Sequence, residues 1–394
     1  MKEKLYDFDT VIDRRGTDAS KWDVADSELP MWVADMDFPT APEIREALEK
    51  RLANGIFGYT DVSPAWREAY AGWWEKRHGL TMDRDALIFV TGVVPAISSI
   101  VRKLTTPGEN VLIQTPVYNI FFNSILNNGC RVAENPLLYD GRAYAMDLAG
   151  LEERMADPQT NLMILCNPHN PVGKIWDRET LAAVGELAKR YHVTVIADEI
   201  HCDLTAPGRD YIPFASVSET CREVSITLVA PTKAFNLAGL QTAAAYVPDP
   251  VLRHKVWRAF NTDEIAEPNA FATVAATAAF SEGGAWLGEL REYLWENRRF
   301  VAETLAKELP EVFVVDGEAT YLLWIDVSAL GGDSREIADF LQAQTGLFLS
   351  NGVQYGTGGE HHLRMNIACP RVMCGDGVQR LLKGLQAWKA LHRE

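Results

Sequence analysis

The feature that most constrains the fold is a series of short, almost wholly apolar segments separated by stretches with helical spacing. Residues 86–90, 162–166 and 193–197 are the clearest examples. A strand that is apolar on both faces must be buried on both, and this is typical of a parallel sheet covered by helices on each side. We therefore expect an α/β fold with a mainly parallel central sheet and helices on both faces.

Three of the predicted strands are followed closely by a residue that can take part in chemistry. These residues are Asn170, Asp198 and Lys233, and the strand before the lysine is Ser225–Val229. In open α/β sheets, the loops at the carboxyl ends of the strands converge on one crevice. We expect the three side chains to meet there, although each alone also fits an ordinary polar residue at a strand end.

Lys233 lies in a run of small and apolar residues, 230–240. Burial disfavours the charged form of an amine, so its pKa falls and it becomes a nucleophile toward carbonyls. Pyridoxal phosphate needs an imine-forming lysine, an anion at its ring nitrogen and a hydrogen-bond donor to its 3-oxygen. Lys233, Asp198 and Asn170 would supply these three groups.

A phosphate-binding turn is predicted upstream. Gly92 follows a strand and opens a helix, so the amides of Val93 and Val94 are free at a helix N-terminus, where the dipole favours an anion. Many strand–helix turns share this pattern, and the turn alone does not identify a phosphate site.

Composition excludes several classes of function. The 394 residues carry a formal net charge of −16, which argues against nucleic-acid binding. The six cysteines form no CxxC pair, so we expect neither a disulfide framework nor a zinc site. The first residues lack the apolar core of a signal peptide, and no apolar run approaches a membrane span, which predicts a cytoplasmic protein.

The pattern changes after Pro310, where short strands alternate with a helix and indicate a second, α+β lobe. We expect a large α/β domain over residues 41–284. A smaller α+β domain would be built from both termini, residues 1–40 and 285–394.

The ordered motifs resemble those of fold-type I pyridoxal-phosphate enzymes. Within that group the chain is most similar to the cystathionine β-lyase (C–S lyase) subgroup of class I/II aminotransferase-like proteins, the MalY/PatB type. The motifs are Asn167-Pro168-His169-Asn170-Pro171, Asp198-Glu199-Ile200-His201 and Thr232-Lys233, together with residues 14–18, 32–38, 55–60, 92–96, 233–241 and 364–370. The resemblance covers nearly the whole chain.

The resemblance implies pyridoxal 5′-phosphate as cofactor and a role for each matching residue. Lys233 matches the imine-forming lysine, Asp198 the partner of the ring nitrogen and Asn170 the partner of the 3-oxygen. Tyr118 matches the aromatic residue that stacks on the ring. Arg364 matches the arginine that binds the substrate carboxylate, for which a planar guanidinium is suited.

For the cofactor's phosphate, the resemblance implies contacts from the amides of Val93 and Val94. Tyr59 matches a tyrosine that reaches the phosphate in a neighbouring subunit, which implies a homodimer. Contacts at Thr232 and His201 are left open.

Three positions depart from the aminotransferase pattern: Gln241 replaces an arginine, His201 a tyrosine and Ala230 a serine. The C–S lyase subgroup shares the glutamine and the histidine. The departures favour α,β-elimination of cystathionine or a related cysteine S-conjugate. An aminotransferase, or a regulatory protein that keeps the fold, remains the alternative.

Several residues also have simpler interpretations. Tyr59 could be a loop aromatic at the dimer interface, His201 a buried core histidine and Arg364 part of a salt bridge. Neither the adjacent histidines 361 and 362 nor any other cluster predicts a metal site, because neighbouring side chains on a strand point to opposite faces. We expect both histidines to be exposed.

Overall fold

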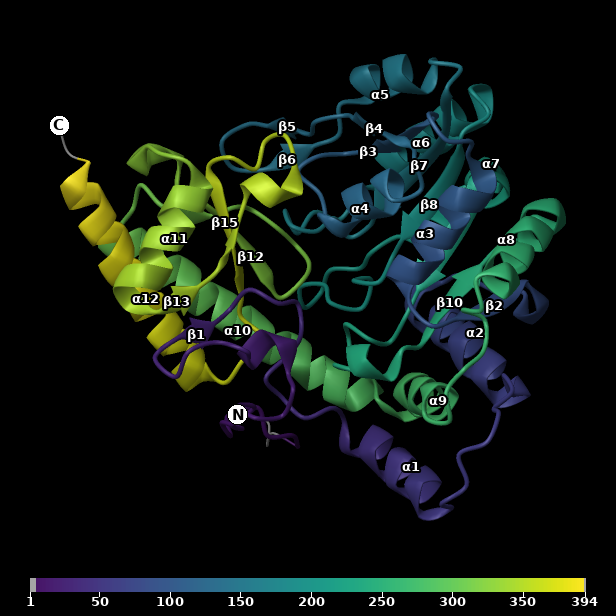
Figure 1. Ribbon diagram of the computed structural model, residues 1–394, viewed down its shortest axis with the longest axis horizontal. Coiled ribbons are helices and arrows are strands. Elements are labelled where there is room, and N and C mark those ends of the chain that lie inside the picture. Colours follow the sequence, from purple (N-terminus) through teal and green to yellow (C-terminus); the bar gives the residue numbers. More distant parts are fainter. Residues whose placement is uncertain (1–4, 393–394) are drawn as a thin grey trace.

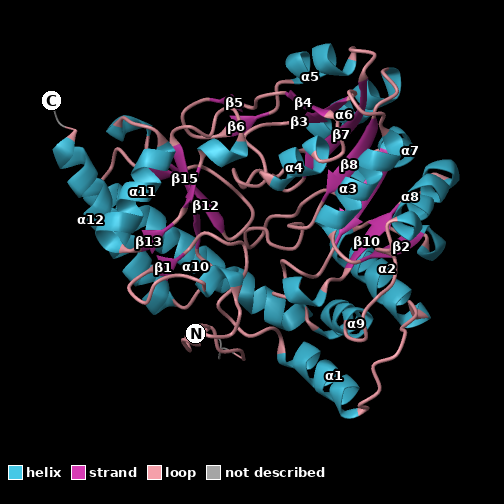
Figure 2. Ribbon diagram, viewed as in Figure 1, coloured by secondary structure: helices cyan, strands magenta, loops and turns pink. Residues whose placement is uncertain are grey.

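The computed structural model describes residues 5–392, and two sheets organise it (Figure 1). One is a seven-stranded sheet formed by the first two thirds of the chain, and the other is a four-stranded sheet formed by the last third. Figure 2 shows the strands of the two sheets as separate groups, with helices around each.

The large sheet consists of β2 (Leu87–Val90), β3 (Asn110–Ile113), β4 (Arg131–Glu134), β7 (Thr160–Cys166), β8 (Thr194–Asp198), β9 (Ser225–Val229) and β10 (Ala243–Tyr246). Their order across the sheet is β2-β10-β9-β8-β7-β3-β4. Only β10 runs antiparallel to its neighbours. The prediction of a mainly parallel α/β sheet is therefore confirmed.

Helices cover both faces of this sheet because its strands are apolar on both sides. Along β7, Leu162 and Ile164 join one hydrophobic cluster, whereas Met163 and Leu165 join another on the opposite face. The first cluster includes α3 (Val93–Leu104), α4 (Ile120–Leu126) and α8 (Pro250–Thr262). The second includes α5 (Leu148–Met155), α6 (Arg178–Arg190) and α7 (Glu219–Val224).

A third helical group lies beside the sheet and consists of α1 (Pro42–Ala53), α2 (Pro64–His78) and α9 (Ala272–Glu282). Its core is aromatic: Trp66, Tyr70 and Trp74 of α2 are buried, and Phe280 of α9 packs edge-on against Tyr70 and Trp74.

The smaller lobe contains an antiparallel sheet of order β11-β12-β15-β14. Its elements are α10 (Gly284–Glu308), β11 (Phe313–Val314), β12 (Leu322–Asp326), α11 (Ser334–Thr345), β13 (Leu347–Phe348), β14 (Ser350–Asn351), β15 (His362–Asn366) and α12 (Arg371–Leu391). The N-terminal segment joins this lobe, because β1 (Leu29–Pro30) pairs in parallel with β13. The pairing supports a small domain built from both termini, but the boundaries at residues 41 and 284 stay a prediction.

Some elements had no counterpart in the sequence analysis. They are the half-buried strand β4, the short hairpin β5 (Leu138–Tyr139) and β6 (Tyr144–Ala145), the helices α5 and α7, and the long C-terminal helix α12. One expectation about exposure was wrong for His362, whose side chain is buried and stacks on Trp324, while His361 is exposed. No helix within residues 5–392 is long and apolar enough to cross a membrane.

Candidate active site

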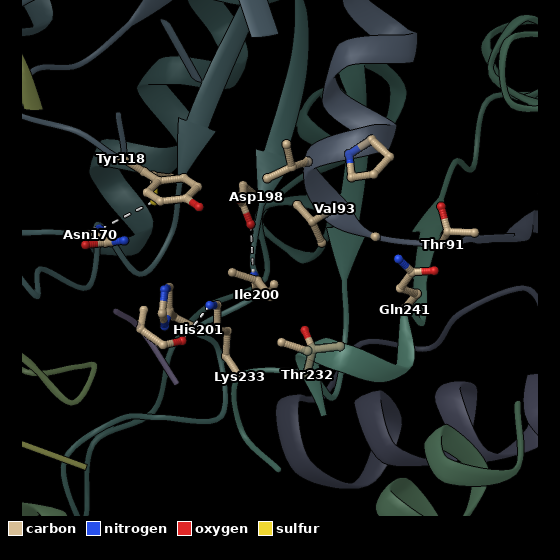
Figure 3. Close-up of a pocket in the computed structure, with 16 residues that line it drawn as sticks. Thr91, Val93, Tyr118, Asn170, Asp198, Ile200, His201, Thr232, Lys233 and Gln241 are labelled. Carbon is tan, nitrogen blue, oxygen red and sulfur yellow. Dashed lines mark hydrogen bonds between the residues drawn. The ribbon is translucent and has the colours of Figure 1, made fainter. Parts of the chain in front are cut away.

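A cavity of about 280 Å³ opens beside the carboxyl ends of β7, β8 and β9. Its lining includes the predicted residues Asn170, Asp198 and Lys233, which come from three different loops (Figure 3). It also includes the predicted residues Val93, Val94, Tyr118, His201 and Thr232. The convergence follows from the parallel sheet, in which equivalent strand ends lie at one edge.

Lys233 lies on the loop after β9, with its side chain directed into the cavity (Figure 3). Its amine donates a hydrogen bond to the backbone carbonyl of Ala34 at 2.7 Å. Burial, and then the positive charge of Arg364, lower the pKa of Lys233 to about 8. The amine therefore has a substantial uncharged fraction near neutral pH, as a nucleophile or a general base requires.

Asp198 is the last residue of β8 and is buried. One carboxylate oxygen accepts the backbone amide of Ile200 at 3.2 Å. Burial raises the pKa of Asp198 to about 7, against the opposing effects of that hydrogen bond and of Lys233. A buried carboxylate facing a cavity is costly unless a cation meets it, so the position suits a positively charged ligand atom.

Arg364 lies on β15 of the smaller lobe and contacts the site through Asn170 of the large sheet's loops. Its Nη1 donates to Asn170 Oδ1 at 3.3 Å and its Nη2 donates to the carbonyl of Trp32 at 2.8 Å. Its Nε atom is buried without a hydrogen-bond partner. The guanidinium also lies over the ring of Tyr355, 5.0 Å from the ring centroid. These contacts are not those of a simple salt bridge, and a donor is left for an anion.

The turn between β2 and α3 forms the other end of the cavity. Val93 and Val94 occupy the first turn of α3, and Gly92 provides no side-chain cap for that helix. The amides of a first helical turn have no intrahelical acceptor. Thr232 and Gln241 also line this end. Gln241 has φ of 52°, a left-handed conformation that is uncommon for a residue other than glycine.

His201 lines the cavity beside Lys233 and is buried (Figure 3). Its Nδ1 atom has no hydrogen-bond partner. Burial, followed by the charges of Lys233 and Arg364, lowers the pKa of His201 to about 3. The imidazole is therefore neutral at physiological pH. An unpaired ring nitrogen does not match the interpretation of His201 as a satisfied core histidine.

Two predicted site residues do not line the cavity on this chain: Arg364, which contacts the lining residue Asn170, and Tyr59, which lies apart from it. The side chain of Tyr59 is fully exposed. It lines a separate shallow hollow with Phe57, whose ring packs on that of Phe271 at 5.6 Å between centroids. Within a single chain, Tyr59 therefore does not join the other site residues.

Five further residues line the cavity and were not predicted from the sequence: Ala34, Thr91, Cys166, Ile200 and Ala238. Most of these contribute backbone or small apolar groups, which carry no chemical signature in a sequence. Ala34 had one available signal, because residues 32–38 are apolar with spaced aspartates and lie between prolines 30 and 39.

A group of possible metal ligands occurs elsewhere among the described residues, at His78, Cys202 and Asp203. Asp203 already accepts hydrogen bonds from His78 Nε2 at 3.0 Å and Trp73 Nε1 at 3.1 Å, and it forms an ion pair with Arg77, whose Nε lies 2.9 Å from the carboxylate. These three partners account for the buried carboxylate without a metal ion.

Comparison with known proteins places this geometry in context. Residues 29–381 match the family model for class I and II aminotransferases. The chain is 42% identical to cystathionine β-lyase PatB of Bacillus subtilis, over 96% of this chain and 99% of that protein. It is 32% identical to MalY of Escherichia coli, over 97% and 100%. A pyridoxal-phosphate-bound C–S lyase from Staphylococcus hominis superposes with a TM-score of 0.91 at 33% identity, covering 96% of this chain and 98% of that one.

Proposed function

The chain belongs to the class I and II aminotransferase family, and on this basis we propose that it is a pyridoxal-phosphate-dependent carbon–sulfur lyase. The reaction is the α,β-elimination of cystathionine or a related cysteine S-conjugate to pyruvate, ammonia and a thiol. The observation that carries the proposal is the meeting of Lys233, Asp198 and Asn170 in one cavity of a chain 42% identical to a cystathionine β-lyase.

The polar groups of the cavity fit pyridoxal phosphate. Lys233 would hold its aldehyde carbon, and Asp198 would lie against the protonated ring nitrogen, which would relieve the cost of a buried carboxylate. Asn170 and the unpaired Nδ1 of His201 would face the 3-oxygen, and Tyr118 would stack on the ring.

The phosphate would bind at the N-terminus of α3. The amides of Val93 and Val94 and the hydroxyl of Thr232 are the donors on this chain. Gln241 lies at the same end and can donate a hydrogen bond without carrying charge. A tyrosine from a second subunit would complete this end of the site.

The bound cofactor supplies an electron sink for the substrate's Cα, and the protein supplies the proton transfers. Lys233, once the substrate's amine has replaced it on the cofactor, would be a buried free amine and would take the Cα proton. The C–S bond then breaks with its electron pair on sulfur, and Lys233 is placed to return a proton to the leaving thiolate. Water hydrolyses the released enamine to pyruvate and ammonia.

Arg364 would bind the substrate's α-carboxylate. Its buried, unpaired Nε and its contact with Asn170 support this role, because a guanidinium offers two parallel donors to a carboxylate. The same contact would set the distance between the carboxylate site and the cofactor ring.

We further propose a homodimer in which Tyr59 enters the neighbouring cavity. Ile56, Phe57 and Tyr59 form an exposed, largely apolar loop with exposed fractions of 71%, 53% and 106%. Apolar side chains gathered on one loop favour burial at an interface. This loop would be covered by a second copy of the chain.

Elimination and transamination are separated by one incubation. The cofactor-loaded protein is mixed with L-cystathionine without any keto acid, and pyruvate, ammonia and free thiol are measured. We expect many turnovers and equal amounts of the three products. Consumption of only one substrate per site, with turnover restored by an added keto acid, would identify an aminotransferase and contradict the proposal.

A further inference from the structure

Residues 32–38, here called the strap, contribute Ala34 to the lining of the cavity, and several of their backbone carbonyls accept hydrogen bonds from side chains. The carbonyl of Trp32 accepts Arg364 Nη2 at 2.8 Å. The carbonyl of Ala34 accepts Lys233 Nζ at 2.7 Å. Arg364 and Lys233 therefore donate to carbonyls of the strap that are two residues apart.

The carbonyls on either side of Ala34 are both bound by the side chain of Asn366, and that of Asp35 also accepts Lys21 Nζ at 3.5 Å. Asn366 Nδ2 donates to the carbonyl of Val33 at 2.5 Å and to that of Asp35 at 2.6 Å. Asn366 Oδ1 accepts the backbone amide of Ala368 at 2.7 Å, and only 1% of Asn366 is exposed. Both the nitrogen and the oxygen of the carboxamide are thus hydrogen-bonded, and the nitrogen binds the strap on each side of Ala34.

We propose that Asn366 is a positioning residue for the lysine, because it fixes the Ala34 carbonyl at the place where that carbonyl receives the amine of Lys233. The inference rests on the proposed function only in that Lys233 is the residue that attaches the cofactor.

The physical reason lies in the freedom of the two partners. A lysine side chain has four rotatable bonds, and an irregular backbone segment has two soft dihedrals per residue. With the carbonyls of Val33 and Asp35 held, the Val33–Ala34 and Asp35–Met36 peptides have little freedom to rotate, and they lie on either side of the peptide that carries the Ala34 carbonyl. The Ala34 carbonyl is then a fixed acceptor, and the hydrogen bond to it holds the Lys233 side chain in one orientation. Tyr321 reinforces it, because its hydroxyl donates to the same carbonyl at 3.0 Å.

The loop that carries the lysine is attached to the same strap. Asn236, three residues after Lys233, accepts the backbone amide of Met36 at 3.0 Å and donates to the carbonyls of Met36 and Phe38 at 3.0 Å. The strap and the lysine loop are therefore one hydrogen-bonded unit, and Asn366 ties this unit to β15, the strand that carries Arg364.

The chain provides a matched control in Asn297. This asparagine is also fully buried, and its Nδ2 also bridges alternate carbonyls, those of Ile367 and Cys369, each at 3.0 Å. Asn366→Ala and Asn297→Ala each remove two hydrogen bonds from Nδ2 to alternate carbonyls, and Asn366→Ala also removes the bond from the Ala368 amide to its Oδ1. Only the first pair of bonds involves the strap.

The test measures how the cofactor-free protein captures added pyridoxal phosphate on Lys233, followed by visible absorbance across a range of pH. We expect Asn366→Ala to slow capture on the order of tenfold or more, because the amine loses its fixed direction. The pH midpoint of capture should fall, because the ammonium form loses a carbonyl acceptor, while Arg364, Asp35, Asp198 and His201 still surround the amine. Asn297→Ala should leave both quantities unchanged.

Equal effects of the two asparagine variants on the capture rate and its pH midpoint would overturn the inference. A rise of the pH midpoint in Asn366→Ala would also overturn it, because it would indicate that water enters the site. If Asn366→Ala does not fold, Tyr321→Phe tests the same carbonyl with an isosteric ring, and an unchanged capture rate and midpoint would contradict it. Failure of the wild-type protein to capture the cofactor at all would instead refute the proposed function.

Discussion

At the scale of single residues, the site holds buried carboxyl groups that cost the protein stability. Burial raises the pKa of Asp198 to about 7, and burial also raises the pKa of its neighbour Glu199 to about 8. Unfolded carboxyl groups titrate near pH 4, so the folded state binds these protons more tightly. The contribution of these two groups to the free energy of unfolding is therefore fully present below about pH 4 and is lost as the pH rises to 7 or 8.

Asp198→Asn should stabilise the cofactor-free protein at pH 8, by about 2–4 kcal/mol, and have little effect at pH 4. The reason is that the amide never ionises in the buried position. Urea unfolding at the two pH values measures the difference. The same variant should bind pyridoxal phosphate more weakly, because the ring nitrogen loses its anion.

Glu199→Gln is the matched control for this prediction. Glu199 is buried one residue further on, and it accepts hydrogen bonds from the Tyr211 hydroxyl and the Phe214 amide, both at 2.8 Å, rather than lining the cavity. It should change stability with pH in the same sense and leave cofactor binding intact. If Asp198→Asn brought no gain at pH 8, the interpretation of Asp198 as a buried carboxyl group that destabilises the fold when ionised would be wrong.

At the scale of elements, the loop that follows β8 is attached to helix α2 through Asp203. On α2, His78 and Trp73 hydrogen-bond to this carboxylate, and Arg77 forms an ion pair with it. Burial alone would raise the pKa of Asp203, but the hydrogen bond and charge of His78 and the charge of Arg77 keep it below the usual value. The contact holds α2 against the loop that begins with the two carboxylates at the end of β8.

Asp203→Ala should destabilise the protein by about 3–5 kcal/mol, because it leaves buried donors without an acceptor. Asp26→Ala is the comparison, since Asp26 is fully exposed and its pair with Arg15 spans 3.9 Å. The exposed pair should contribute less than about 1 kcal/mol. Chemical denaturation compares the two variants, and similar costs would contradict the role given to Asp203.

At the scale of the whole molecule, the proposed homodimer predicts that two inactive variants can restore activity to each other, which is impossible if each chain forms its site alone. Tyr59→Ala and Lys233→Ala should each impair the protein as homodimers. In a mixed dimer, one cavity combines an intact Lys233 with an intact Tyr59 from the other chain. We expect the co-refolded protein to recover activity. Each mixed dimer should reach up to about half the activity of the wild-type dimer, because one of its two cavities is intact.

An activity of the mixture equal to the average of the two separate variants would contradict this arrangement and place Tyr59 outside the neighbouring cavity. Cofactor binding measured on the same samples distinguishes a lost phosphate contact from a lost interface. Light scattering shows whether each variant still dimerises.

Much of the fold was predictable because apolar strands and helical spacing are local signals. The strand Ser225–Val229 was predicted with its observed bounds, and the helix predicted to open after Gly92 begins at Val93. The strap and its grip by Asn366 were not predictable, because they join positions more than 300 residues apart through backbone carbonyls. His362 was misassigned because the second lobe's aromatic packing, which buries it on Trp324, leaves no periodic pattern.

The central claim, that this cavity binds pyridoxal phosphate covalently on Lys233, is tested most directly by locating the attachment. The protein is loaded with the cofactor and reduced with borohydride, and its peptides are analysed by mass spectrometry. We predict one cofactor per chain on Lys233, and none in Lys233→Ala. Attachment to another lysine, or no attachment to the wild-type protein, would contradict the account.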